Sequence, residues 1–230
     1  MGRIMSNDLR DQAPVGAAAP CPGPGASADG DCLSAFDNLY AARLAAWVRS
    51  DAELTWLAPG TVPPLSASKV AAWGHRAGHR LLFWHGAGAD PIGYAELNKM
   101  PIDPNQMWIG HCLLDPAVRG RGLGERFVHA LLCRAFDALA AQSVVLVVFP
   151  DNVAAIRCYR NNGMIITGRE EKHFKTTRRR HEFLRMGIDR DHFQQLQAAG
   201  HWEREPARYV ETPADARRGA ERRRRAISSA

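Results

Sequence analysis

Residues 119–124 read Arg-Gly-Arg-Gly-Leu-Gly and lie between an apolar segment at 107–114 and a long amphipathic segment that begins at Gly122. Three glycines at alternate positions directly before a helix leave its first backbone N–H groups open to a ligand. Those groups and the positive end of the helix dipole favour an anion, and the two arginines add charge and donors. The stretch therefore predicts a phosphate-binding loop at a strand-to-helix turn.

Other phosphate-binding loops have different spacings. A Walker loop requires Lys and then Ser or Thr after its last glycine, whereas Glu125 and Arg126 follow Gly124. In the dinucleotide fingerprint the third glycine stands one position later than it does here. A simpler alternative is that the three glycines only make a tight connection between strand and helix.

The segments on either side of the loop predict a βαβ-like unit. Residues 107–114 and 143–149 are apolar enough for strands, and the second has the contiguous apolar residues of a strand buried on both faces. Between them, about 17 residues place apolar and charged side chains on opposite faces, as in an amphipathic helix. A further short helix is expected at 154–161, where an Asn-Gly pair ends it.

Farther from the loop the pattern predicts more helices and strands. Apolar residues at helical spacing predict a helix over residues 33–48, and Ser66 is suited to cap a second helix. Strands are expected at four more places: 81–84 and 92–97, which form a hairpin, and 164–167 and 181–188. A basic connection at 169–180 joins the last two strands.

Length and composition indicate a soluble globular protein. The 230 residues are 46% hydrophobic and 23% charged, and we expect a disordered extension at 1–32, one domain at 33–203 and a disordered basic tail at 204–230. The tail has eight arginines and four acidic residues, so it contributes +4 of the formal charge of +6. The longest apolar run has six residues, far fewer than the roughly 20 of a membrane span, and the first thirty residues lack a signal pattern. We therefore expect a cytoplasmic protein that does not enter a membrane.

Cysteine and histidine positions suggest neither a disulfide framework nor a metal site. The five cysteines are odd in number and form no Cys-x-x-Cys pair, so we expect reduced, mostly buried thiols. The nine histidines show no spacing typical of metal ligands with nearby acids or cysteines. No metal is expected.

The pattern Arg119-x-x-Gly122-x-Gly124, after a strand that ends in Asp-Pro, resembles the acetyl-coenzyme A loop of the GNAT N-acetyltransferases. A second element of that family also matches, because the apolar strand at 143–149 is followed by Asn152 and by a helix that carries Tyr159. The resemblance implies a mixed α/β fold whose strongly bent sheet splays between its fourth and fifth strands, here 107–114 and 143–149, with flanking helices.

The same resemblance implies that acetyl-CoA is the co-substrate and that a primary amine of a small molecule or peptide is the acceptor. The pantetheine arm would pair with the end of the fourth strand, and Asn152 would contact that arm or an adjacent group. The pyrophosphate would meet the N–H groups of residues 121–124. The residues that it assigns to the cofactor are Cys112, Leu113, Leu114, Arg119, Gly120, Arg121, Gly122, Leu123, Gly124, Asn152 and Tyr159.

In this family a neutral amine attacks the thioester carbonyl directly, and the coenzyme A thiolate leaves. Tyr159 matches the position of the family's usual proton donor, although its ring could simply cap the core. Many relatives carry a glutamate early on the fourth strand, where this chain has Met-Trp-Ile at 107–109. The general base is therefore open between Glu96, which could instead be a solvent-facing strand residue, and His111, which could instead be hydrogen-bonded in the core.

Two other functions stay open at this point. The chain could keep the cofactor cleft without the chemistry and act as an acyl-CoA sensor. Alternatively, the run of four arginines at 222–225 could bring the protein to RNA or a ribosome, although such a run usually stays solvated. The identity of the amine, the acyl length and the oligomeric state are not set by the sequence.

Overall fold

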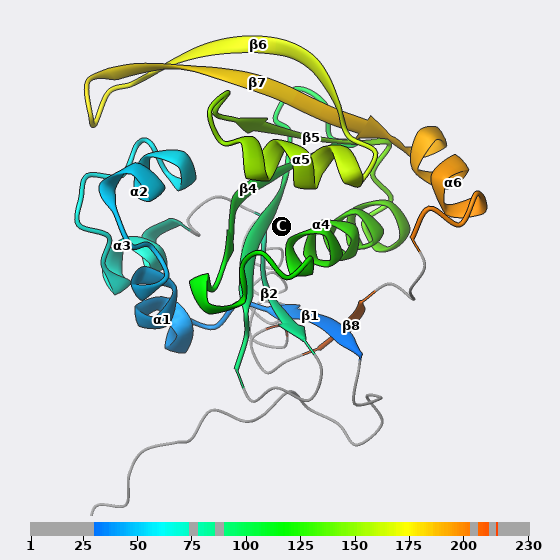
Figure 1. Cartoon of the computed structure of the whole chain (residues 1–230), viewed down its shortest axis with the longest axis horizontal. Helices are drawn as coiled ribbons and strands as arrows, with labels where there is room; N and C mark the ends of the chain where they lie inside the picture. The colour runs from blue at the N-terminus through cyan, green and yellow to red at the C-terminus, as the bar shows by residue number, and fades with distance from the viewer. Residues whose placement is uncertain (1–29, 74–77, 86–89, 203–206, 212–214, 216–230) are drawn as a thin grey trace, which may run out of the picture.

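The computed structural model describes residues 30–73, 78–85, 90–202, 207–211 and 215 (Figure 1). In these residues the chain forms a mixed sheet of eight strands in the order β6-β7-β5-β4-β3-β2-β1-β8. The strands are β1 (Asp31–Ala35), β2 (Gly78–His85), β3 (Gly93–Lys99), β4 (Gln106–Leu114), β5 (Ser143–Val148), β6 (Ile165–Phe174), β7 (Arg179–Asp189) and β8 (Arg208–Val210). The helices are α1 (Ala41–Ala46), α2 (Asp51–Leu57), α3 (Ala67–Ala72), α4 (Leu123–Cys133), α5 (Val153–Asn161) and α6 (Arg190–Ala198).

The centre of the fold is the unit that the sequence predicts around the glycine-rich loop. β4 and β5 are parallel, and α4 crosses from one to the other and continues as a π-helical turn to Ala138. α4 buries one face on the sheet, where the rings of Phe127 and Phe83 stack with centroids 4.8 Å apart. The hairpin of β2 and β3, the short helix α5 and the Ser66 cap of α3 are also confirmed.

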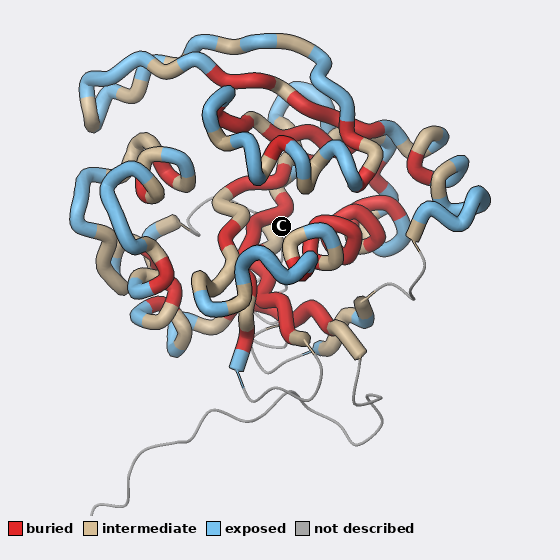
Figure 2. The backbone as a smooth tube through the Cα atoms, in the orientation of Figure 1, coloured by how far each residue is buried: buried red, intermediate tan, exposed pale blue. Residues whose placement is uncertain are grey.

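Both faces of the central strands are buried, against different helices (Figures 1 and 2). Leu81 and Phe83 of β2 belong to the core on the α4 side of the sheet. Their neighbours Leu82 and Trp84 belong to a second core that includes residues of α1 and α3. Side chains alternate across a strand, so contiguous apolar residues let one strand serve two cores.

The predicted helix over residues 33–48 is wrong in its first part. The chain enters as strand β1, pairs antiparallel with β2 over five residues and only then turns into the short helix α1. Asp37 stops the strand, because its carboxylate accepts the Leu39 N–H and starts a 3-10 turn. Tertiary pairing with β2 overrides the helical spacing of the apolar residues.

The predicted connection at 169–180 is wrong as well, because most of it is strand. β6 continues to Phe174 and β7 begins at Arg179, so the two form a long antiparallel hairpin at the edge of the sheet (Figure 1). Its outer part is held by backbone pairing and by exposed ion pairs such as Arg180 with Glu171. Backbone pairing needs no apolar side chains, so this segment forms a strand although its charged composition gives no apolar strand pattern.

The sheet extends beyond the predicted domain at both ends. Asp31 and Cys32 of the predicted extension are in β1, and β8 of the predicted tail pairs parallel with β1. Expected disorder elsewhere in these two segments, and the four arginines at 222–225, lie outside the described residues. The division into extension, domain and tail stays a prediction there.

Candidate active site

β4 and β5 are neighbours that pair only at one end. Their parallel register covers residues 106–108 of β4 and 143–145 of β5. Beyond it, the second half of β4 continues along β3, up to Leu114 opposite Gly93. This separation confirms the splay expected between the fourth and fifth strands, and it leaves the predicted cofactor residues 112–114 without paired residues on β5.

The glycine-rich loop leads from β4 into α4 with an open surface. Gly120 and Gly122 have φ of +75° and +76°, in the left-handed region that favours glycine. A Cβ atom at either position would meet no heavy atom within 4 Å. Gly122 caps α4 without a side chain, and the first N–H groups of a helix have no partner within the helix. Open space above backbone donors and the positive end of a helix dipole is suited to a phosphate.

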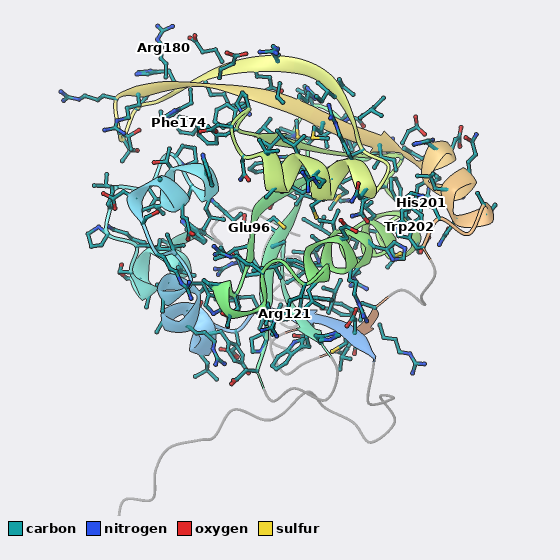
Figure 3. The ribbon with its side chains drawn as sticks, viewed as in Figure 1. Glu96, Arg121, Phe174, Arg180, His201 and Trp202 are labelled. Carbon is teal, nitrogen blue, oxygen red and sulfur yellow. The ribbon has the colours of Figure 1, made fainter. Side chains whose placement is uncertain are left out.

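The two arginines of the loop have different surroundings. Arg119 donates hydrogen bonds to the carbonyls of Leu114 and Trp47, both at 3.1 Å, and to the Glu53 carboxylate at 2.8 Å. Its side chain therefore fastens the loop to helices α1 and α2. Arg121 is exposed in the loop, near the start of α4 (Figure 3), and is the arginine with a side chain available to a ligand.

Helix α5 carries the predicted proton donor. Its cap is Asn152, whose Oδ1 accepts the Ala155 N–H at 3.2 Å, so the amide N–H₂ group is available to a ligand. Tyr159 packs against the core, and its hydroxyl interacts with the Cys112 thiol. Burial raises the pKa of Tyr159 well above its usual value, as do the nearby thiols of Cys112 and Cys158. The hydroxyl is thereby kept protonated, which is the form that can donate.

Glu96 is 5% exposed and lies near the middle of the molecule, between α1–α3 and α4 (Figure 3). The alternative of a solvent-facing strand residue is therefore wrong. The Tyr94 hydroxyl donates to Glu96 Oε1 at 2.7 Å, and Arg80 Nε donates to the Tyr94 oxygen at 2.8 Å. Burial raises the pKa of Glu96, but His111, the Tyr94 hydroxyl and the Arg80 charge outweigh it, so the pKa lies below its ordinary value.

His111 reaches Glu96 because β4 contains a bulge. Opposite the single residue Ala95 of β3, β4 has two residues, His111 and Cys112. His111 has φ of +44°, its ring stacks on Trp73 with centroids 4.3 Å apart, and its Nδ1 is 3.1 Å from Glu96 Oε1. The Nδ1 contact has the distance of an ion pair without the alignment of a hydrogen bond.

The candidate residues form two groups on opposite faces of the sheet. Glu96 and His111 lie with Tyr94 and Trp73 on the face that α1 and α3 cover. Cys112 and Tyr159 pack against the core on the face that α4 and α5 cover. The residues predicted to accept and to donate a proton therefore lie on different faces of the sheet.

Three neighbours of this site were not predicted as site residues. Tyr94 could have been found, because residues two apart on a strand share a face and Glu96 is two positions later. Trp73 is a neighbour because its ring stacks on that of His111. Arg80 gave no sequence signal, because an arginine on a strand normally points to solvent.

Neither metal ligation nor a membrane span is seen in the part of the chain that the structure describes. There, no group of three His, Cys, Asp or Glu side chains is placed to hold a metal ion. None of the described helices combines the length and the apolar character needed to cross a bilayer.

Known proteins resemble the chain in sequence and in fold. A family model described as Acetyltransferase (GNAT) family matches residues 42–164. The N-alpha-acetyltransferase RimI of Mycobacterium tuberculosis is 30% identical over 92 residues, which are 40% of this chain and 56% of that protein. The chain therefore spans little more than half the length of this relative.

Solved structures share the fold over most of their length. The aminoglycoside acetyltransferase AAC(6')-Ib in complex with coenzyme A has a TM-score of 0.58 and 20% identity, over 73% of this chain and 99% of that one. The spermidine N-acetyltransferase from Vibrio cholerae in complex with CoA and spermine has a TM-score of 0.60 and 16% identity, over 72% of this chain and 98% of that one. At such low identity these likenesses concern the fold alone.

Proposed function

Because the chain belongs to the GNAT acetyltransferase family, we propose that it transfers an acetyl group from acetyl-CoA to a primary amine of a small molecule or peptide. The observation that carries this proposal is the open glycine-rich loop at the start of α4, beside the splay of β4 and β5. The relatives are named as an N-alpha-acetyltransferase, an aminoglycoside acetyltransferase and a spermidine N-acetyltransferase, so the class of amine is left to experiment.

The proposed cofactor site follows the splay from β4 to the loop. The backbone of residues 112–114 pairs with the pantetheine arm, and the Asn152 amide contacts the same arm. The N–H groups of residues 121–124 bind the pyrophosphate, with Arg121 as the side chain that adds charge. Arg119 supports this site through its hydrogen bonds to the protein.

The proposed chemistry is direct attack of the amine nitrogen on the thioester carbonyl. An alkylammonium has a pKa of about 10.4, so only about one molecule in a thousand is neutral near pH 7 and a proton acceptor helps. The pair of Glu96 and His111 accepts the proton of the amine as the C–N bond forms. The C–S bond then breaks, and Tyr159 gives its proton to the coenzyme A thiolate.

Two measurements on the purified protein test the proposal. Acetyl-CoA should raise the melting temperature in proportion to RT ln(1 + [L]/Kd), and an unchanged melting temperature at millimolar ligand would contradict a cofactor site. Release of free thiol should then follow when amines from polyamines through aminoglycosides to peptide N-termini are added. Binding without thiol release from any amine would instead support the acyl-CoA sensor.

A substitution at Gly122 tests the loop itself. We expect Gly122→Asp to weaken acetyl-CoA binding at least tenfold, because it places a carboxylate at the pyrophosphate site. Gly122→Asn is the matched control, since asparagine has nearly the same shape and also tolerates positive φ. Calorimetric titration should show a much smaller loss for the asparagine variant, and equal affinities of the two variants would contradict a bound anion.

A further inference from the structure

We propose that Arg80 is a positioning residue for the proton acceptor: through the Tyr94 hydroxyl it directs the Glu96 carboxylate toward His111. This role rests on the acetyl transfer proposed above. Neither the loop nor the family resemblance assigns a role to Arg80, which lies on β2 directly opposite Glu96 of β3.

The Arg80 side chain is held on every side within the core. It is 7% exposed, and its guanidinium carbon lies 3.9 Å from the centroid of the Phe36 ring. Its Nη2 donates to the Val70 carbonyl at 2.7 Å, and its Nε donates to the Tyr94 oxygen at 2.8 Å. Among the described residues it makes no ion pair with Glu96, so its contact with that carboxylate runs through Tyr94.

The donors of Arg80 set the direction of this chain of hydrogen bonds. A guanidinium has only N–H donors, so the Tyr94 oxygen accepts from Arg80 and its own proton points to Glu96 Oε1, 2.7 Å away. Glu96 Oε1 also lies 3.1 Å from His111 Nδ1. At that distance the negative charge of the carboxylate lies beside the His111 ring, where it can stabilise the positive charge that develops as the pair takes the proton of the amine.

The charge of Arg80 also balances that of Glu96. A buried carboxylate is costly unless it is paired, and the two charges sum to zero. The other titratable groups in contact with Glu96 are Tyr94 on the same strand and His111 on β4. At the end of α3, the uncharged Trp73 lies beside His111. Without Arg80 the carboxylate would be buried without a balancing charge, which would favour its protonated form over the form that accepts a proton.

Three variants separate this role from simple packing. Arg80→Gln removes the charge, Arg80→Lys keeps the charge but not the fork of donors, and Tyr94→Phe removes only the linking hydroxyl. We expect kcat to fall at least tenfold in Arg80→Gln and Tyr94→Phe, while the KM of the amine stays within threefold of wild type or falls. The acidic limb of the pH profile of kcat/KM should move up by about one pH unit.

A titration of the full-length protein gives a readout that needs no activity. The carboxyl carbon of Glu96, observed by NMR after ¹³C labelling and assigned with Glu96→Gln, should titrate at higher pH in Arg80→Gln and in Tyr94→Phe than in wild type. Arg80→Lys should return the midpoint most of the way, because the charge is kept. Acetyl-CoA affinity should be unchanged in all three variants, since the cofactor site lies at the loop and the splay.

The outcomes distinguish the competing explanations. A lower melting temperature with an unmoved Glu96 midpoint and an unmoved pH profile would make Arg80 a packing residue and overturn the proposal. Should Arg80→Gln not fold, Tyr94→Phe alone decides, because its ring stays in the core. A wild-type protein that releases no thiol with any amine would instead contradict the acetyl transfer, and the NMR titration would still show whether Arg80 controls Glu96.

Discussion

At the scale of single residues, Tyr159 offers a sharp test of the chemistry, because the proposed reaction uses its hydroxyl group and not its ring. Replacing Tyr159 by Phe keeps the ring in the core and removes the proton that the thiolate would take. We expect kcat to fall by about 10²-fold, with the Kd of acetyl-CoA within threefold of wild type. Thiol-release kinetics and calorimetry measure the two quantities.

The control for this prediction is Tyr209→Phe, a change of the same kind on β8, away from the splay. Its kcat should match that of wild type. If Tyr159→Phe turned over as fast as this control, Tyr159 would be a residue that caps the core.

A second residue, His129 of α4, predicts how stability depends on pH. This residue is 8% exposed, and its ring stacks on Trp202 with centroids 4.4 Å apart (Figure 3 labels Trp202). Burial, together with the nearby His201, lowers the pKa of His129 to about 4. The unfolded chain binds this proton near pH 6.5, so the contribution is complete above pH 6.5 and is lost as the pH falls toward 4.

The free energy of unfolding should therefore fall by about 1 kcal/mol between pH 7 and pH 5.5 on account of this group. Denaturant titrations of His129→Gln should show a flatter pH dependence in that window. His173→Gln, at an exposed position of β6, is the control and should follow wild type. A slope unaltered by His129→Gln would contradict the assignment.

At the scale of elements, the strand-to-helix loop depends on helices that come much earlier in the chain. Arg119 joins the loop to Glu53 of α2 and to the end of α1. We expect Glu53→Gln to weaken acetyl-CoA binding and Arg119→Gln to weaken it more, because Arg119→Gln also loses the hydrogen bonds to the Leu114 and Trp47 carbonyls. The double variant should show a coupling of about 0.5–1 kcal/mol in the free energy of unfolding, as for a partly exposed ion pair.

Calorimetry and denaturant titration of the two single variants and the double variant give these values. An affinity that falls in Arg119→Gln but stays unchanged in Glu53→Gln would contradict this anchor and favour direct contact of the Arg119 side chain with the phosphates. The motif position alone suggested that direct contact.

The elements that the sequence predicts well are those with one strong period. α4 and β5 were predicted because their apolar residues repeat at the helical spacing or run without interruption. β1 was missed because residues 33–48 satisfy a helical period, although pairing with β2 decides their structure. The β6–β7 hairpin was missed because an edge hairpin can be mostly charged and still form its backbone hydrogen bonds.

In the candidate site, too, the sequence predicts some residues and contacts but not others. The loop could be found because glycines before a helix have few other uses, and positive φ at Gly120 and Gly122 agrees with that expectation. The contact between Glu96 and His111 depends on an extra residue in β4, which no alternation of side chains reveals. No sequence pattern places Arg80 beside Glu96, because the two residues meet only through the pairing of β2 with β3.

At the scale of the whole molecule, the C-terminal segment returns to the first strand. β8 pairs parallel with β1, and the Tyr209 ring lies 3.6 Å from the guanidinium carbon of Arg134, at the end of α4. We expect deletion of residues 203–230 to lower the melting temperature by several degrees, because β1 loses its edge partner and Arg134 loses this contact. Deletion of residues 216–230 should leave it within about one degree.

Differential scanning calorimetry of the two truncated proteins and of Tyr209→Ala measures these changes. Tyr209→Ala should reproduce part of the loss that the longer deletion causes. Equal melting temperatures for the two deletions would contradict a structural role of β8. A gel-shift assay with RNA on the shorter deletion, which removes the four arginines, tests the nucleic-acid alternative in the same material.

The bulge in β4 joins the two groups of residues to which the proposed proton transfers are assigned. His111 and Cys112 are consecutive, yet one is beside a carboxylate under α3 and the other beside a phenol under α5. A single peptide unit therefore connects the proposed proton acceptor on one face of the sheet with the proposed proton donor on the other. Any shift of that peptide unit moves His111 and Cys112 together. Deletion of one residue from β4 should therefore abolish turnover, while the loop still binds the pyrophosphate.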